Sequence, residues 1–195
     1  MTTANKVTIG RILLIPVFIV QGVYYVQTGN ELCRLIAMLA FGLAAISDGI
    51  DGYIARRYNQ FSELGAVLDP LADKLLLLSA LVLLSFDNRP WFDRLPLWLT
   101  ATVFSRDAIL LLGSIVIHYI CGKMRVRPRI LGKISTVLLM VVVSWTLLKW
   151  NSASIYYLAL ATALTTIGSG ILYLVDGVRQ LNASPQSASS NWPVA

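Results

Sequence analysis

Six stretches of mostly apolar residues follow one another along the chain, with short polar segments between them. They cover residues 8–26, 35–56, 65–86, 95–120, 130–150 and 155–178. Each is close to the roughly 20 residues that a helix needs to cross the hydrocarbon core of a bilayer. Turn-forming residues separate them, such as Gly29-Asn30 after the first stretch and Gly122 after the fourth. The pattern predicts an all-α, polytopic membrane protein with six transmembrane helices.

The composition supports the same class of protein. Of the 195 residues, 56% are hydrophobic and 13% are charged, whereas about 25% of the residues in a soluble domain are charged. The length fits a single domain. We expect this membrane domain to span residues 1–181, because residues 182–195 are rich in Ser, Asn and Ala, have no apolar periodicity, and are expected to form a disordered tail.

The basic residues predict how the helices are oriented in the membrane. With the N-terminus in the cytoplasm, ten Lys and Arg residues fall in inner segments and four in outer ones. The outer four would be Arg34, Arg89, Arg94 and Lys149. Since basic residues accumulate on the cytoplasmic side of membrane proteins, this orientation is favoured.

Residues 1–27 have a competing interpretation as a signal peptide, in which Lys6 and Arg11 would form the basic region. However, Pro16 interrupts the apolar run, and no small-x-small cleavage site follows closely after Val20. We therefore expect the segment to be the first transmembrane helix.

Four of the ten acidic residues lie close together, in the second and third apolar stretches. They are Asp48, Asp51, Asp69 and Asp73. An aspartate at the centre of a membrane helix costs about 2.5–3.5 kcal/mol on insertion scales, and neighbouring carboxylates repel each other. Residues three or four apart share a helix face, and the short polar link makes the two helices antiparallel neighbours. All four carboxylates are therefore expected in one polar cavity that opens to the cytoplasm.

A divalent cation would neutralise such a cluster. Carboxylate oxygens suit hard cations such as Mg²⁺ or Mn²⁺, and four carboxylates could hold two ions that clamp a diphosphate. Beside them, Gly52 and Gly65 leave room for a ligand, and Arg56 could pair with phosphate oxygens. The alternative for one acid pair taken alone is a salt bridge between helices, with Arg56 or Lys74 as the partner.

The spacing of these residues resembles the signature of the CDP-alcohol phosphatidyltransferase family, D-x2-D-G-x2-A-R-x8-G-x3-D-x3-D, at every defined position. The resemblance implies a homodimeric enzyme with six membrane helices that transfers a phosphatidyl group from a CDP-linked donor to an alcohol and releases CMP. It implies that Asp73, besides ligating metal with the other three aspartates, is the general base for the acceptor hydroxyl. The residues that would contact the donor are Gly52, Arg56, Ser62 and Gly65.

The likeness extends beyond the signature. The opening segment Asn5-x-x-Thr8-x-x-Arg11 and the segment from Leu68 to Lys74 resemble phosphatidylglycerolphosphate synthases. This similarity implies CDP-diacylglycerol as the donor and glycerol 3-phosphate as the acceptor. It also implies a location in the bacterial plasma membrane, with the active site on the cytoplasmic side.

Basic residues in the second half of the chain are candidates for binding the acceptor. Arg106 lies inside an apolar stretch, where an arginine needs a partner, and the adjacent Asp107 points about 100° away around the helix. We hypothesise a pocket for the acceptor phosphate that is lined by Arg106, Arg127, Arg129 and Lys133. A basic run at a membrane boundary can also simply reflect topology or contact with anionic lipid.

Two other acceptors or activities stay open at this point. The segment Ser105-Arg106-Asp107 with Lys133-Ile134-Ser135-Thr136 also resembles CMP-forming cardiolipin synthases, which would use phosphatidylglycerol as the acceptor. A small divalent-cation or ion-coupled transporter would also carry intramembrane acids. Transporters usually have inverted repeats around a midplane site, whereas these acids cluster in one hairpin. No aromatic-interleaved basic patch supports nucleic-acid binding.

Overall fold

The computed structural model describes the backbone of residues 3–58, 63–86, 88, 90–121 and 130–182. Side chains are described within these ranges except at residues 3–7, 48–58, 63–67, 69, 70, 114, 116–121, 152 and 179–182. The described backbone forms six α-helices and contains no strand. They are α1 (Thr3–Thr28), α2 (Glu31–Tyr58), α3 (Glu63–Ser85), α4 (Leu97–Cys121), α5 (Ile130–Leu147) and α6 (Ser152–Asn182). The six predicted helices are confirmed, with ends that differ by a few residues.

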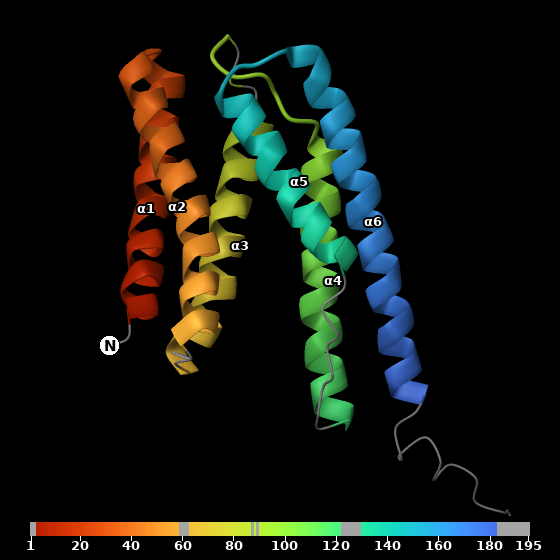
Figure 1. Ribbon diagram of the computed structural model, residues 1–195. Helices are drawn as coiled ribbons and strands as arrows, with labels where there is room; N and C mark the ends of the chain where they lie inside the picture. Colours follow the sequence, from red (N-terminus) through yellow and green to blue (C-terminus); the bar gives the residue numbers. More distant parts are fainter. Residues whose placement is uncertain (1–2, 59–62, 87, 89, 122–129, 183–195) are drawn as a thin grey trace, which may run out of the picture.

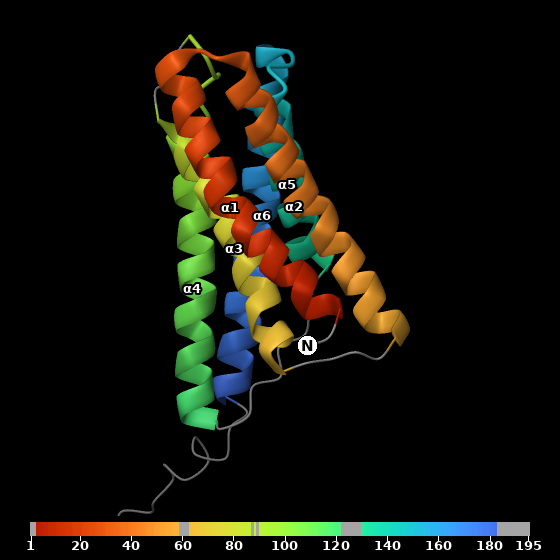
Figure 2. The same cartoon turned by 90° about the vertical axis from the view of Figure 1, so that its left-hand side faces the viewer.

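The helices run up and down in two groups (Figure 1). In the first group α1 packs against both α2 and α3, and in the second α6 packs against both α4 and α5. Helix α5 also contacts α2 and α3, so it joins the two groups. The α1–α2, α3–α4 and α5–α6 connections lie at one end, here called the hairpin end, and the N-terminus lies at the other (Figures 1 and 2).

Large apolar side chains occur both inside and outside the bundle. The interior holds fully buried residues such as Phe18, Leu81 and Leu99, while outward-facing residues such as Leu13 and Leu112 are about two-thirds exposed. A soluble monomer rarely exposes so much contiguous apolar surface, but lipid chains cover such a surface in a membrane. Among the described residues, three segments are long and apolar enough to cross a bilayer: Thr8–Thr28, Ile130–Leu147 and Ala153–Val178. The chain is an integral membrane protein.

Polar and aromatic residues at the hairpin end tie the three connections together. Glu31, at the start of α2, accepts hydrogen bonds from Arg34 Nε at 2.6 Å and from Tyr25 Oη at 3.2 Å. Lys149, in the α5–α6 connection, reaches the same carboxylate at 3.4 Å and lies 5.0 Å from the centroid of the Tyr25 ring. That ring packs edge-on against Trp91 in the α3–α4 connection. The five residues, which we call the hairpin-end cluster, therefore hold both groups of helices in register.

The backbone at two helix ends makes these contacts possible. Gly29 ends α1 with a φ of +68°, and a Cβ at this position would overlap the Trp91 indole. Lys149 lies just after the end of α5 with a φ of +52°, in a conformation for which glycine is the usual residue. The hydrogen bonds from Lys149 N to Thr146 O and from Trp150 N to Trp145 O complete this helix cap. Lysine is retained in a strained conformation because its ammonium group bridges α1 and α2.

The Glu31 carboxylate should make the stability of the protein depend on pH. Partial desolvation would raise the pKa of Glu31, but the hydrogen bonds and charges of Arg34 and Lys149 outweigh it, so the pKa lies below its ordinary value of 4.5. A lowered pKa means that Glu31 stabilises the fold above about pH 4.5, and that this contribution is lost as the pH falls through the lower, folded-state pKa. In thermal unfolding in detergent, we expect Glu31→Gln to lower the midpoint at pH 7 and to reduce its drop towards pH 3.5. An unchanged midpoint and pH profile would contradict this role.

Candidate active site

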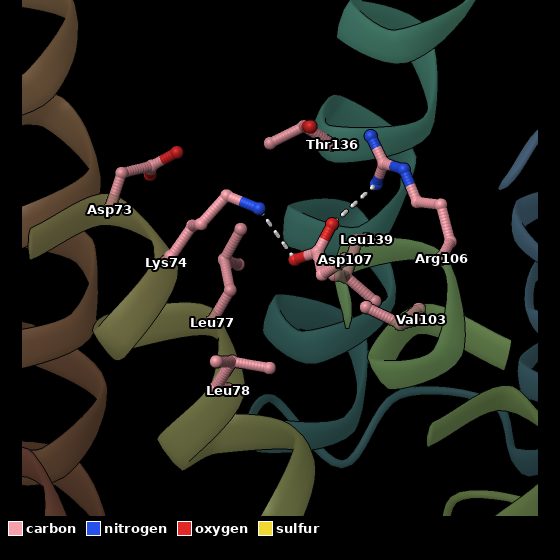
Figure 3. A pocket seen from close by; sticks show the side chains of 9 residues that line it. All are labelled: Asp73, Lys74, Leu77, Leu78, Val103, Arg106, Asp107, Thr136 and Leu139. Atoms are coloured by element: carbon pink, nitrogen blue, oxygen red, sulfur yellow. Dashed lines mark ion pairs between the residues drawn. The ribbon is translucent and has the colours of Figure 1, made fainter. Parts of the chain in front are cut away.

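A small cavity with charged residues in its wall lies between α3, α4 and α5 (Figure 3). Its volume of about 70 Å³ is enough for several water molecules. The side chains that line it are Asp73, Lys74, Leu77, Leu78, Val103, Arg106, Asp107, Thr136 and Leu139. Within each helix these positions are adjacent or three or four residues apart, which places them on one side of the helix. The cavity therefore forms where polar positions on the three helices meet.

Asp107 joins the charged side chains of two helices. Its Oδ2 atom lies 2.9 Å from Lys74 Nζ on α3, and its Oδ1 atom lies 3.5 Å from Arg106 Nη1 on its own helix. The side chains of Arg106 and Asp107 are only 14% and 16% exposed, whereas Lys74 is 42% exposed. Sequence reasoning offered Lys74 as a partner for one of the clustered acid pairs, but its ion pair among the described residues is with Asp107.

The Arg106 side chain extends from α4 and lies beside α5 and α6. A Cβ at Gly132 would lie 3.8 Å from Arg106 Nη2 and 3.3 Å from Tyr173 Oη, and a Cβ at Gly170 would lie 3.7 Å from Arg106 Cγ. Two glycines on different helices therefore lie beside the Arg106 side chain, at distances where a Cβ would make ordinary van der Waals contact with it. The Nε atom of Arg106 is buried and has no hydrogen-bond partner among the described residues. Buried donors are usually satisfied, so this atom is a candidate for a hydrogen bond to a ligand.

The structure places the predicted metal ligands on the expected helices. Asp48 and Asp51 belong to α2, and Asp69 and Asp73 belong to α3. The two helices contact each other and run in opposite directions. Asp73 lines the cavity, while the side chains of the other three lie outside the described residues. Among the described side chains, no three His, Cys, Asp or Glu residues gather into a metal site. The four-carboxylate cluster stays a prediction.

The other predicted site residues fall into three sets. Arg106 lines the cavity, as the acceptor-pocket hypothesis requires. Lys133 is exposed on α5 and is not among the residues that line the cavity. The remaining positions lie outside the described side chains, so their roles stay predictions: Gly52, Arg56, Ser62, Gly65, Arg127 and Arg129.

Four polar residues of the cavity region were not predicted as site residues. Asp107 and Lys74 carried a signal, because opposite charges within apolar helices need partners. Thr136 and Tyr173 carried none that distinguishes them from ordinary packing residues. The Thr136 hydroxyl donates a hydrogen bond to Gly132 O, one turn earlier in the same helix, at 3.1 Å.

The fold and the cavity together define a helical membrane protein with charged residues gathered between its helices. Comparison with known proteins gives its family. The family profile described as CDP-alcohol phosphatidyltransferase matches residues 1–167, which is most of the chain. The chain therefore belongs to the CDP-alcohol phosphatidyltransferase family, and it is a transferase.

Similar proteins within this family carry two kinds of name. The CDP-diacylglycerol–glycerol-3-phosphate 3-phosphatidyltransferase of Salmonella typhimurium is 33% identical over 86% of this chain and 90% of its own length. A probable phosphatidylglycerophosphate synthase of Mycobacterium tuberculosis is 31% identical over 95% of this chain and 86% of its own. The CMP-forming cardiolipin synthase of Streptomyces coelicolor is 35% identical over 93% of this chain and 84% of its own. Family membership favours phosphatidyl transfer over ion transport.

Proposed function

We propose that the protein transfers the phosphatidyl group of CDP-diacylglycerol to glycerol 3-phosphate, forming phosphatidylglycerol phosphate and CMP. The observation that carries this proposal is the position of Arg106, whose guanidinium lines the same cavity as Asp73. An acceptor bound through its phosphate to Arg106 would have a hydroxyl near Asp73. The names of the relatives from Salmonella typhimurium and Mycobacterium tuberculosis support the same acceptor.

In the proposed reaction, the acceptor hydroxyl attacks the phosphorus that carries diacylglycerol. Asp73 takes the hydroxyl proton as general base. The new bond joins the acceptor oxygen to this phosphorus, and the bond from phosphorus to the bridging oxygen of the CDP moiety breaks. CMP leaves with the electron pair of that bond. Arg56, with Gly52, Ser62 and Gly65, would hold the CDP moiety in place.

Asp48, Asp51, Asp69 and Asp73 would hold one or two Mg²⁺ or Mn²⁺ ions. Asp73 fits such an ion, because it offers carboxylate oxygens, the preferred ligands of hard cations, at the wall of a cavity that other charged residues also line. When bound, the ions would neutralise the diphosphate and make its phosphorus more electrophilic. The chain's own residues would orient the donor and the acceptor and accept the proton.

Arg106 suits a phosphate monoester for electrostatic reasons. Guanidinium groups bind phosphate oxygens in pairs, and Arg106 has a buried Nε that is not engaged by a described residue. Among the described residues, the ion pair of Arg106 is with Asp107, and its Nη1 atom lies 3.5 Å from Asp107 Oδ1. A free phosphate monoester carries more charge than the phosphodiester of phosphatidylglycerol and would gain more from this site. Lys133, Arg127 and Arg129 would complete the pocket from α5 and the segment before it.

Phosphatidylglycerol is the second candidate acceptor, which would make the product cardiolipin. The 35% identity to the Streptomyces coelicolor cardiolipin synthase favours it, as does the Ser105-Arg106-Asp107 sequence. Both reactions release CMP and use the same donor, so the lipid product distinguishes them.

We also infer that all six helices cross the membrane, with the N-terminus in the cytoplasm. The basic residues support this orientation, which would put the hairpin end outside and the aspartate ends of α2 and α3 at the cytoplasmic face. The membrane would be the bacterial plasma membrane, since the relatives named above are bacterial. A homodimer is proposed on the family resemblance.

The acceptor can be tested with the purified full-length protein in detergent micelles. We expect CMP release from CDP-diacylglycerol only with Mg²⁺ or Mn²⁺, and fastest with glycerol 3-phosphate among glycerol 3-phosphate, phosphatidylglycerol, inositol phosphate and serine. Thin-layer chromatography of the radiolabelled lipid identifies the product. Cardiolipin formation from phosphatidylglycerol, with no reaction of glycerol 3-phosphate, would replace the first proposal by the second.

A further inference from the structure

Lys74 occupies an unusual position next to the proposed metal and base site. It directly follows Asp73 on α3, and both side chains line the cavity. An ammonium group on a flexible four-carbon chain can pair with a nearby carboxylate and so compete with a cation for it. Figure 3 shows the Lys74 side chain lying between the carboxylates of Asp73 and Asp107. Its ion pair among the described residues is with Asp107, at 2.9 Å, and not with Asp73.

Asp107 is well placed to hold Lys74 in this position. It belongs to α4, and its carboxylate is largely buried and faces α3 across the cavity. Lys74 is more exposed and belongs to a neighbouring helix. Of the two partners, Asp107 is therefore the constrained one, and Lys74 is the side chain that would move if the pair were broken.

We propose that Asp107 is a positioning residue that holds the Lys74 ammonium group away from Asp73, so that Lys74 does not compete with a divalent cation for the Asp73 carboxylate. This inference rests on the proposed function, because it assumes that Asp73 ligates metal. Asp107 lies outside the signature between Asp48 and Asp73, and its proposed role is to position Lys74 rather than to bind metal or substrate. The same carboxylate contacts Arg106, so one residue sets the positions of both cationic side chains in the cavity.

The test measures Mn²⁺ binding and needs no turnover. Mn²⁺ alone is titrated into the purified full-length protein, and the free ion is quantified by electron paramagnetic resonance. In Asp107→Asn, which keeps the size of the side chain but removes its charge, Lys74 should turn to Asp73. We expect the Kd for Mn²⁺ to rise roughly fivefold, equivalent to about 1 kcal/mol, the upper range for a partly exposed ion pair.

A second substitution separates this role from a structural one. In the double variant Asp107→Asn with Lys74→Met the competitor is gone, so Mn²⁺ affinity should return to within about twofold of the wild-type value. If Asp107 merely supported the fold, the second substitution would leave affinity low or reduce it further. Asp93→Asn makes the same chemical change in the α3–α4 connection, at the hairpin end, and should leave Mn²⁺ binding unchanged.

The outcomes distinguish this inference from the function on which it rests. Unchanged Mn²⁺ affinity in Asp107→Asn, or a double variant that does not recover, would overturn the role of Asp107 alone. A wild-type protein that binds no Mn²⁺ would overturn the proposed metal site and this inference with it. If Asp107→Asn does not yield folded protein, Lys74→Met by itself decides. Unchanged or tighter Mn²⁺ binding supports Lys74 as a restrained competitor, and weaker binding overturns it.

Discussion

Replacing Asp73 with asparagine is expected to reduce phosphatidyl transfer at least about a thousandfold, because general-base catalysis alone contributes roughly 10²- to 10⁴-fold. Asparagine has nearly the same size but can neither accept the acceptor proton nor supply an anionic oxygen to a cation. Asp73 lines the cavity between α3, α4 and α5, so the loss should appear in kcat at saturating concentrations of both substrates.

Binding of the donor should largely survive this substitution. The residues proposed to contact the CDP moiety are Gly52, Arg56, Ser62 and Gly65, and none of them is changed. The shift in melting temperature caused by CDP-diacylglycerol can be compared between wild type and Asp73→Asn. Asp93→Asn is the matched control and should retain full activity. An Asp73→Asn enzyme with more than a tenth of wild-type kcat would exclude Asp73 as the base.

The second large effect is expected at Arg106. A hydrogen bond to a charged group contributes about 1.5–3 kcal/mol, so loss of the guanidinium should raise the KM for glycerol 3-phosphate roughly 10- to 150-fold. The KM for CDP-diacylglycerol should change by less than about twofold, because Arg106 lies on α4 and the donor-binding residues lie on α2, α3 and the link between them. Initial rates with each substrate varied in turn measure both constants.

The choice of substitution matters at this position. The Arg106 side chain packs beside Gly132 and Gly170. Arg106→Met, which preserves much of the side-chain volume, is therefore preferable to Arg106→Ala. Arg106→Lys keeps the charge but not the paired donors and should give an intermediate KM. Lys133→Ala tests the other described residue of the hypothesised acceptor pocket. Its effect on the KM should be smaller, since Lys133 does not line the cavity between α3, α4 and α5. Unchanged acceptor kinetics in both the Arg106 and the Lys133 variants would remove them from the pocket.

The helices and the family of this protein could be predicted from its sequence. In lipid, the backbone must satisfy its own hydrogen bonds, and about 20 apolar residues are needed to cross the bilayer. Both requirements act locally, so the apolar stretches mark α1 to α6 to within a few residues. The signature between Asp48 and Asp73 is also local, because its eight defined residues lie within one helical hairpin.

The pairing of side chains between helices could not be predicted in this way. Hydropathy specifies neither the rotation nor the tilt of a helix in a bundle, because helices in lipid associate by close packing rather than through a hydrophobic driving force. The charge on Lys74 suggested a partner, but its partner among the described residues, Asp107, follows from how α3 faces α4. Likewise, Glu31 and Lys149 are 118 positions apart and meet because two connections lie at the same end.

The amino-acid sequence alone thus determined where the helices lie along the chain, which family they belong to and which carboxylates are candidates for chemistry. Only the tertiary structure decided that Arg106 reaches the cavity of Asp73 and that Asp107 holds Lys74. The Arg106 side chain lies beside Gly132 on α5 and Gly170 on α6, two helices other than its own. Contacts of this kind depend on how whole helices are oriented in three dimensions, which no short-range pattern in the chain encodes.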